Sequence, residues 1–429
     1  MLCSRSTTRR NRILPVSAES SEIEIFQTSC FVLRHMNCFQ GINIISPAAS
    51  TRAVFLPSDC EILTEITDSH GFIISGPSST LNLYTQWESA YSKKQKKRVA
   101  KWAKIMKGGQ DGRLYRSSEL KKLVRKGVPS HLRGKLWMDL SGASAKMASD
   151  AGLYQRYVDE APATCRPDVL SLIEVDLHRT FPHHPNFNPS CLTKCAAEDK
   201  FDCQPTETPH LQSLRRVLRA YSARNKLVGY CQGMNFIAGA MLLFLNEESC
   251  FWLLATLLED ILPSDYYDRE LFGCNIDLMV LQELLPQVAP RTAIILSEAG
   301  LGLELLAVEW MVCAFVRSLG SEPALRIWDC LFSEGGKVLF RAALALVRAA
   351  EPALLAATAS VNGGKGRKEE AVLGWMQTAG KGHIDADRLL KDAFALPLRR
   401  RDIEAARERC RDQLAKRAAA ARAVAKPAE

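Results

Sequence analysis

The 429-residue sequence lacks the features of secreted and membrane-spanning proteins. Its 14 cysteines include no Cys-x-x-Cys pair, and several, such as Cys250, Cys313 and Cys330, sit within apolar helical patterns. Scattered cysteines of this kind are typical of reduced thiols and argue against a disulfide-stapled fold. The most apolar run, Phe236–Leu245, has about half the length that a membrane span requires. We therefore expect a cytoplasmic protein whose attachment to endomembranes, where it occurs, is peripheral.

The sequence also lacks the motifs of nucleic-acid-binding proteins. No zinc-finger, RNP or basic-zipper pattern is present, so we expect no nucleic-acid partner. The two most informative runs, Ile173–Arg179 and Tyr230–Asn235, hold no metal ligand set, no nucleophile paired with a base and no phosphate-cradling loop. The net charge of +9 is moderate for this length and indicates a preference for anionic surfaces.

Composition and periodicity divide the chain into four parts. In residues 1–85, short alternating runs such as Ile62–Ile66 and Phe72–Ile74 have the pattern of strands but are broken by glycine and proline, and we expect a poorly ordered N-terminal region. The first eighteen residues lack acids and faintly resemble a transit peptide, although a disordered tail is the simpler interpretation. A basic helical lead-in is expected over 86–124, a helical domain over 125–350, and a C-terminal helical extension over 351–429.

Basic residues dominate from Lys93 to Lys135, where Asp111 and Glu119 are the only acids. One interpretation is a patch that binds anionic lipid or an acidic partner. The other is a solvated basic helix packed through Trp87 and Trp102. Both interpretations remain open at this point.

From Arg125 onward, apolar residues recur with the spacing of helices. The segment Leu211–Asn225 places leucine, valine and tyrosine on one face and predicts a helix with a buried stripe. Further core helices are expected over 251–261, 303–316, 323–332 and 338–349. No strand-like alternation interrupts them, and we predict an all-α fold.

A first run, Ile173–Arg179, places Ile173, Asp176 and Arg179 on one helical face. Pro182 disfavours helix at the preceding residue, which puts Arg179 near the helix end, where it can project from the surface. Asp176 lies within reach of the arginine and can direct its approach. The plainer alternative is an exposed salt bridge between the two.

A second run contains Tyr230, Gln232, Gly233 and Asn235 between two apolar helical segments. A glycine there lets the backbone approach another molecule closely. The plainer alternative is a turn between helices in which Asn235 caps the following helix. Arginine and glutamine are the side chains that GTP hydrolysis most needs, because one neutralises phosphate charge and the other orients the attacking water.

Two more runs complete a pattern. One is Arg125-Lys-Gly-Val-Pro129, followed by Arg133 and a tryptophan at 137; the other is Leu325–Asp329, a buried helix whose aspartate needs a partner. In this order, the four runs resemble the TBC domain, the catalytic module of Rab GTPase-activating proteins. The resemblance covers residues 125–350, and the phrases around Tyr230 and Trp328 are similar to the growth-hormone-regulated TBC subgroup.

The resemblance implies a fold of two helical lobes and a mechanism with two fingers. Arg179 takes the position of the arginine finger, and Gln232 that of the glutamine supplied in trans. Supporting positions are Asp176, Tyr230, Gly233, Asn235 and Arg133. The implied partner is a Rab-type small GTPase in its GTP-bound form. GTP and Mg²⁺ then belong to that partner, and the chain needs no cofactor or nucleotide site of its own. The alternative is a catalytically silent adaptor that binds a GTPase or a membrane.

The segment Asn188–His210 looks longer than is usual for the family and carries three cysteines. Its Cys191, Cys195 and Cys203 fit no standard zinc spacing, and we interpret the segment as a surface insertion.

Overall fold

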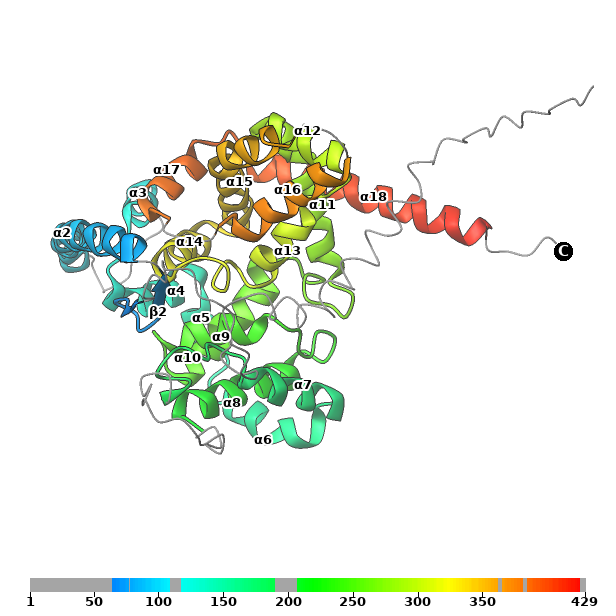
Figure 1. Cartoon of the computed structure of the whole chain (residues 1–429). Helices are drawn as coiled ribbons and strands as arrows, with labels where there is room; N and C mark the ends of the chain where they lie inside the picture. The colour runs from blue at the N-terminus through cyan, green and yellow to red at the C-terminus, as the bar shows by residue number, and fades with distance from the viewer. Residues whose placement is uncertain are drawn as a thin grey trace, which may run out of the picture. The chain divides into compact units, whose positions relative to one another are not determined.

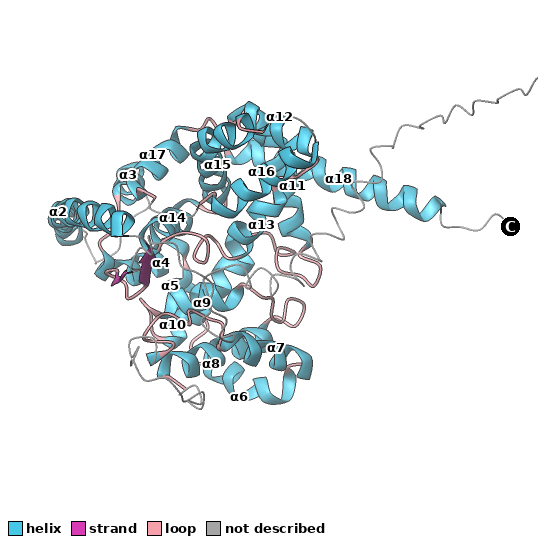
Figure 2. Ribbon diagram, in the orientation of Figure 1, coloured by secondary structure: helices cyan, strands magenta, loops and turns pink. Residues whose placement is uncertain are grey.

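Helices form most of the computed structural model, which describes residues 64–76, 78–108, 117–189, 207–361, 365–380 and 384–424. These residues belong to one compact unit that spans Ser50–Glu429. The described strands, β1 (Thr64–Thr67) and β2 (Ile73–Gly76), form an antiparallel hairpin in which Thr64 pairs with Gly76 (Figure 2). The predicted helical fold is therefore confirmed, and this hairpin falls on two of the short alternating runs of the N-terminal region.

The first group of helices is built around α8 (Pro209–Arg224), which packs against α6, α7, α9 and α10 (Figure 1). The predicted stripe of α8 is buried, and the helix begins where Thr208 Oγ1 accepts a hydrogen bond from the Leu211 amide. The other members of this group are α4 (Arg133–Ser141), α5 (Ala143–Ser149), α6 (Leu153–Thr164), α7 (Pro167–Leu177), α9 (Met234–Leu242) and α10 (Glu247–Thr256), which continues as a π-helical turn over Leu257–Ile261.

The second group is built around α11 (Phe272–Val288) and α15 (Lys337–Ala359), which pack against each other. The remaining members are α12 (Pro290–Ala299), α13 (Glu304–Val312), α14 (Ser321–Glu334), α16 (Lys365–Thr378), α17 (Ala386–Ala395) and α18 (Arg400–Val424). The boundary expected at residue 350 falls inside α15. The helices that follow pack on the core, and Arg407 of α18 forms a bidentate ion pair with buried Asp277 of α11.

Helix α14 joins the two groups, which correspond to the two predicted helical lobes. It packs against α4 of the first group and against α15 and α17 of the second. Residues 322–333 of this helix are all buried. The Trp328 ring meets that of Trp137 on α4, with 5.6 Å between ring centroids. The lobes therefore share one continuous core at this helix.

Residues 64–76 and 78–85, which lie in the region expected to be poorly ordered, form regular structure. The hairpin and the start of α2 (Ser78–Gly108) occupy them, followed by α3 (Ser118–Lys126) and a 3₁₀ turn over Ser130–Leu132. Distant contacts provide the order: Ser321 Oγ donates to Asp68 Oδ2 (2.5 Å), and Tyr91 of α2 donates to Glu322 Oε1 (2.5 Å). Local periodicity carries no sign of such contacts. Residues 1–63 lie outside the described part of the chain.

The helix expected over 303–316 ends early. Helix α13 stops at Val312, and Ala314 and Phe315 take left-handed φ angles of 43° and 70°. The Trp328 indole donates to the carbonyl of Ala314 at 2.9 Å, which satisfies a backbone group that this turn exposes. Within the part of the chain that the structure describes, none of the helices combines the length and apolar character needed to cross a lipid bilayer.

Candidate functional site

Arg179 lies in the turn that follows α7. Its amide donates to the carbonyl of Asp176 at 3.2 Å, and the next amide, of Thr180, donates to Leu177 at 3.1 Å. Phe181 then adopts a left-handed φ of 46° just before Pro182. The proline disfavours helix at the residue before it, so the helix cannot continue. The expected helix end beside Arg179 is therefore confirmed.

An aromatic cluster holds the left-handed Phe181. Its ring is buried and packs edge-on against Phe72 of the hairpin, Phe187 and Phe236, with centroids 5.2, 5.5 and 5.5 Å away. A bulky residue with positive φ persists only where its surroundings determine its conformation. These three rings provide such surroundings, and they fix the backbone two residues after Arg179.

Asp176 sits between Arg179 and the second run. Its Oδ2 accepts a hydrogen bond from the hydroxyl of Tyr230 at 2.7 Å, and its Oδ1 lies 3.6 Å from Arg179 Nη1. Burial raises the pKa of the Asp176 carboxyl, although Tyr230 and Arg179 oppose the shift. Burial, together with Asp176, raises the pKa of Tyr230 well above its ordinary value, so the phenol stays protonated and donates.

Asn235 connects the two runs a second time. Its side-chain amide donates to Thr180 Oγ1 at 2.8 Å and to the Asp176 carbonyl at 3.4 Å, and its Oδ1 accepts from the Gly233 amide at 3.1 Å. The residue is fully buried. Gly233 occupies the cap position of α9 without a side-chain bond, so the alternative in which Asn235 caps that helix is wrong. Asn235 instead joins the glutamine loop to the arginine turn.

Two glycines allow the close packing at this junction. Gly233 has a φ of 109°, and a Cβ placed on it would lie 2.6 Å from Val312 Cγ1 of α13. A Cβ on Gly239 of α9 would lie 2.9 Å from Thr180 Cγ2. Any larger residue would push the glutamine loop away from α13 or α9 away from the arginine turn.

We expect Gly233→Ala to destabilise the fold by about 1–3 kcal/mol more than Gly142→Ala. Gly142 is a matched control because it has a similar φ of 96° but nothing within 4 Å of its added Cβ. Both substitutions share the backbone strain, and only the first meets Val312. Urea unfolding of the two variants measures the difference. Equal losses would show that contact with Val312 does not constrain the loop.

The two proposed fingers are partly exposed above this buried junction. The side chain of Arg179 is 35% exposed and Gln232 is half-buried, whereas Asp176, Tyr230 and Asn235 are buried. Leu172 and Val175 are also exposed on α7, by 53% and 50%. They lie three residues apart on one stripe of α7, which ends two residues before Arg179. Arg179 and Gln232 therefore both keep part of their side chains accessible to solvent, and the chain segment before Arg179 exposes apolar surface.

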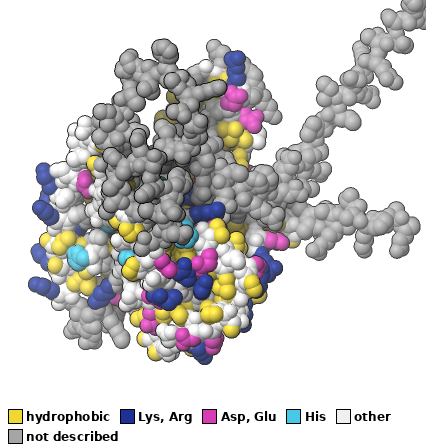
Figure 3. Space-filling view, turned by 60° about the horizontal axis from the view of Figure 1, so that its bottom comes forward, with side chains coloured by type: hydrophobic (Ala, Val, Ile, Leu, Met, Phe, Trp, Pro, Cys, Tyr) yellow, Lys and Arg dark blue, Asp and Glu magenta, His cyan; other side chains and the backbone are white. Residues whose placement is uncertain are grey.

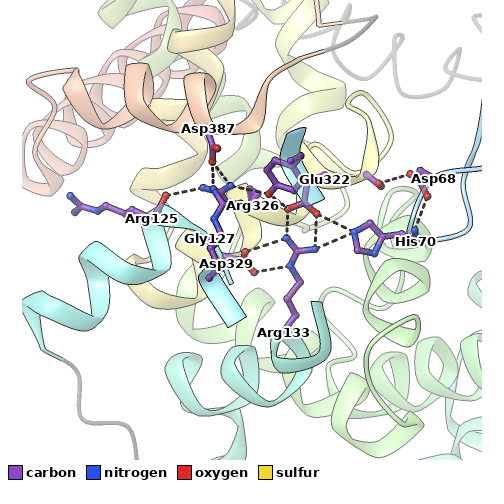
Figure 4. Close-up of polar contacts among 12 residues, drawn as sticks. Asp68, His70, Arg125, Gly127, Arg133, Glu322, Arg326, Asp329 and Asp387 are labelled. Atoms are coloured by element: carbon purple, nitrogen blue, oxygen red, sulfur yellow. Dashed lines mark hydrogen bonds and ion pairs between the residues drawn. The ribbon is translucent and has the colours of Figure 1, made fainter. Parts of the chain in front are cut away.

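Arg133, which we expected to support the site, makes its ion pairs in the buried centre between the lobes (Figure 4). Its guanidinium donates to both carboxylate oxygens of Glu322, at 2.9 and 2.8 Å. Its Nε lies 3.3 Å from Asp329, whose Oδ1 also accepts from the Trp137 indole at 2.9 Å. Asp329, the aspartate of the fourth run, was expected to need a partner, and the structure gives it two, Arg133 and Trp137.

A second arginine extends this network. Arg326 donates to Asp387 of α17 at 2.7 Å and to the Arg125 carbonyl at 2.9 Å (Figure 4). Burial would raise the pKa of Glu322, but Arg133 and His70 outweigh it and hold that pKa well below its usual range. The carboxylate is therefore ionised, and the network of charges ties the hairpin, α3, α4, α14 and α17 together.

Comparison with known proteins identifies the family of this fold. The Rab-GTPase-TBC domain family matches residues 130–355. The chain belongs to this family. Human growth hormone-regulated TBC protein 1 is 39% identical over 277 residues, which cover 64% of this chain and 76% of the human protein. The zebrafish growth hormone-regulated TBC protein 1-A is 39% identical over 296 residues, 68% of this chain and 76% of its own length.

Solved structures agree with this assignment. The crystal structure of the Chlamydomonas flagellar RabGAP TBC domain is 31% identical, with a TM-score of 0.60, and the match covers 77% of this chain and 99% of that one. The Ypt/Rab-GAP domain of Gyp1p, at 18% identity and a TM-score of 0.51, shares the fold over 70% of this chain and 98% of its own.

The segment predicted as an insertion in the TBC domain is only partly described. Cys191, Cys195 and Cys203 lie outside the described residues. Just before it, His184 Nε2 lies 2.9 Å from the carbonyl of His70, and at its end His210 Nε2 lies 3.3 Å from the side-chain amide nitrogen of Asn186. Among residues that the structure does describe, no group of three or more His, Cys, Asp or Glu is arranged to hold a metal ion.

Sequence reasoning missed several residues that build the TBC site. Thr180 is a hydrogen-bond partner of Asn235, and its position directly after Arg179 was the one local signal available. Phe72 and Val312 reach the site from elements more than 70 residues away in the chain. Nothing in their local sequence indicates this role.

Proposed function

We propose that this chain is a GTPase-activating protein for a Rab-type small GTPase in its GTP-bound form. Arg179 neutralises the charge that develops on the phosphates, and Gln232 orients the attacking water. The nucleotide and Mg²⁺ are carried by the GTPase. Membership of the Rab-GTPase-TBC domain family supports the class of partner. We also propose that the protein acts in the cytoplasm, on GTPases at endomembrane surfaces.

The observation that carries the proposal is the pair of side-chain links between the two runs. The hydrogen bond from Tyr230 to Asp176 and the one from Asn235 to Thr180 hold the glutamine loop against the arginine turn. These residues and Gly233 act as positioning residues. Position matters most for this chemistry, since the transition state of phosphoryl transfer is loose and is stabilised by charge held in place beforehand.

The surface around Arg179 also supports a protein partner. Leu172 and Val175 expose about half of their apolar side chains on one stripe of α7, which ends two residues before Arg179. A GTPase that places its nucleotide beside Arg179 would cover both, and buried apolar surface is the main source of affinity at such contacts.

We expect Gln232→Ala to slow GTP hydrolysis by the activated Rab by about a hundredfold to a thousandfold. The carboxamide that positions the water is lost, whereas the surface that binds the GTPase is retained. Single-turnover hydrolysis of GTP by a panel of purified Rab proteins measures the rate. Gln287→Ala, which removes an exposed glutamine at the end of α11, is the matched control and should behave as wild type.

Two results would contradict the proposal. Hydrolysis by Gln232→Ala as fast as by wild type would remove the glutamine from the mechanism. If the wild-type chain binds a GTP-loaded Rab but accelerates none of the panel, the protein is an adaptor.

A further inference from the structure

Helix α2 carries a row of lysines that the function proposed above does not use. Residues 89–108 contain eight basic side chains and no Asp or Glu. Five of the lysines recur at helical spacings that place them on one face, and all five are exposed. This lysine row consists of Lys93, Lys96, Lys97, Lys104 and Lys107.

The opposite face of α2 is fixed to the core. Tyr91 and Trp102 are buried, and the Trp102 indole donates to the Gly127 carbonyl at 2.9 Å. Arg98 donates to Asp387 at 2.5 Å and lies over the Tyr91 ring, 4.9 Å from its centroid. The helix is therefore held in one rotation about its axis, and the lysine row points away from the protein.

In the predicted basic patch, the arginines and the lysines have different surroundings. The described arginines between Lys93 and Lys135 pair with acids of the core: Arg98 with Asp387, Arg125 with Glu334 and Arg133 with Glu322. Most of the lysines in the same range are exposed. The exposed charge of the patch expected over Lys93–Lys135 is thus carried mainly by lysines, five of which share one face of α2 as the lysine row.

We propose that the lysine row docks on an anionic lipid bilayer. The row is straight and about 21 Å long, from the 1.5 Å rise of a helix, which suits a flat surface of like charges. Figure 3 shows several separate Lys and Arg side chains along the left edge, the side on which Figure 1 places α2. Cytoplasmic leaflets attract such polybasic segments.

The composition of the row favours lipid over a protein partner. Protein interfaces are enriched in arginine and aromatic residues and depleted in lysine. On α2 the side chains of Arg98, Tyr91 and Trp102 face inward, and lysines supply the charge of the outer row. A lysine ammonium is a flexible point charge that selects charge without a fixed geometry, as a fluid surface of headgroups requires.

The contact is electrostatic and involves no insertion of the helix. An interfacial helix inserts a wide apolar face into the bilayer, but on α2 Tyr91 and Trp102 are buried against the core, and Val99 and Ile105 are only 39% and 38% exposed. Binding should therefore weaken steeply as salt shortens the range of charge interactions.

The experiment is sedimentation of the full chain with vesicles of phosphatidylserine and phosphatidylcholine in a one-to-two ratio. At low salt we expect the wild type to bind, and the triple variant K93Q/K97Q/K104Q to bind about a hundredfold more weakly. The matched control K122Q/K126Q/K391Q removes the same charge from exposed lysines of α3 and α17 and should bind as wild type. Circular dichroism confirms that both variants fold.

Several outcomes would overturn the proposal. One is equal binding of the two triple variants to the anionic vesicles, and another is failure of the wild type to bind them at low salt. Binding to pure phosphatidylcholine vesicles at the same affinity would exclude the electrostatic basis. Tighter, lysine-dependent binding to duplex RNA or to an acidic protein would assign the row to that partner. None of these readouts depends on GTPase activation.

Discussion

Replacing Arg179 with alanine should slow Rab GTP hydrolysis in the presence of this protein by about three to five orders of magnitude. In the proposed mechanism the guanidinium offsets the charge developing on the transferred phosphoryl oxygens. Its loss leaves that charge to the GTPase alone. The barrier rises by roughly 4–7 kcal/mol, as expected for an arginine finger. Single-turnover hydrolysis at saturating concentrations of the variant measures the effect.

Two further variants separate catalysis from binding and folding. Arg179→Lys keeps the charge but not the planar fork of donors, so most of the activity should still be lost. Arg166→Ala removes an exposed arginine just before the same helix and should leave the rate unchanged. The affinity of Arg179→Ala for the GTP-loaded Rab should stay within a few-fold of wild type. A rate that survives in Arg179→Ala would end the finger assignment.

Removing the charge of Arg133 should produce the largest loss of stability in the chain. Arg133→Met leaves Glu322 and Asp329 buried between the lobes without their cation, since both are almost wholly inaccessible. Breaking a buried ion pair by deleting one partner costs about 3–5 kcal/mol, because the remaining charge is uncompensated. Urea or thermal unfolding of the purified variant measures the loss. A variant that does not accumulate as folded protein agrees with this expectation.

Controls for Arg133 use the contrast between buried and exposed pairs. Arg388 on α17 is 84% exposed and lies 3.8 Å from Asp392. Arg388→Met should therefore cost less than about 1 kcal/mol. Adding Glu322→Gln to Arg133→Met removes the uncompensated acid and should restore part of the loss. If Arg133→Met is no more costly than Arg388→Met, the network does not hold the lobes together.

The position of Arg179 could be predicted because its causes are local. Helical spacing places Ile173 and Asp176 on its face, and Pro182 ends the helix close after it. The buried stripe of α8 followed from the same periodicity. Such features depend on residues within one or two turns, which a single sequence displays directly.

The role of Arg133 could not be predicted because its partners are distant. The motif indicated a residue near the site, whereas Glu322 and Asp329, almost 200 positions later, hold it between the lobes. The sequence likewise left two roles for Asn235, a helix cap or a functional residue. Its hydrogen bond to Thr180 favours the second role. The hairpin has too few residues to produce a clear pattern, and its order comes from tertiary contacts.

The hairpin has a practical consequence for anyone who trims this protein. The family match starts at residue 130, yet the hairpin ends at Gly76 and supplies Phe72 to the ring cluster under Phe181 and His70 to Glu322. A fragment cut to the matched limits would keep both fingers and lose part of their scaffold. Recombinant versions should begin upstream of Thr64 and retain α18, so that weak activity of a shorter fragment is not mistaken for an inactive protein.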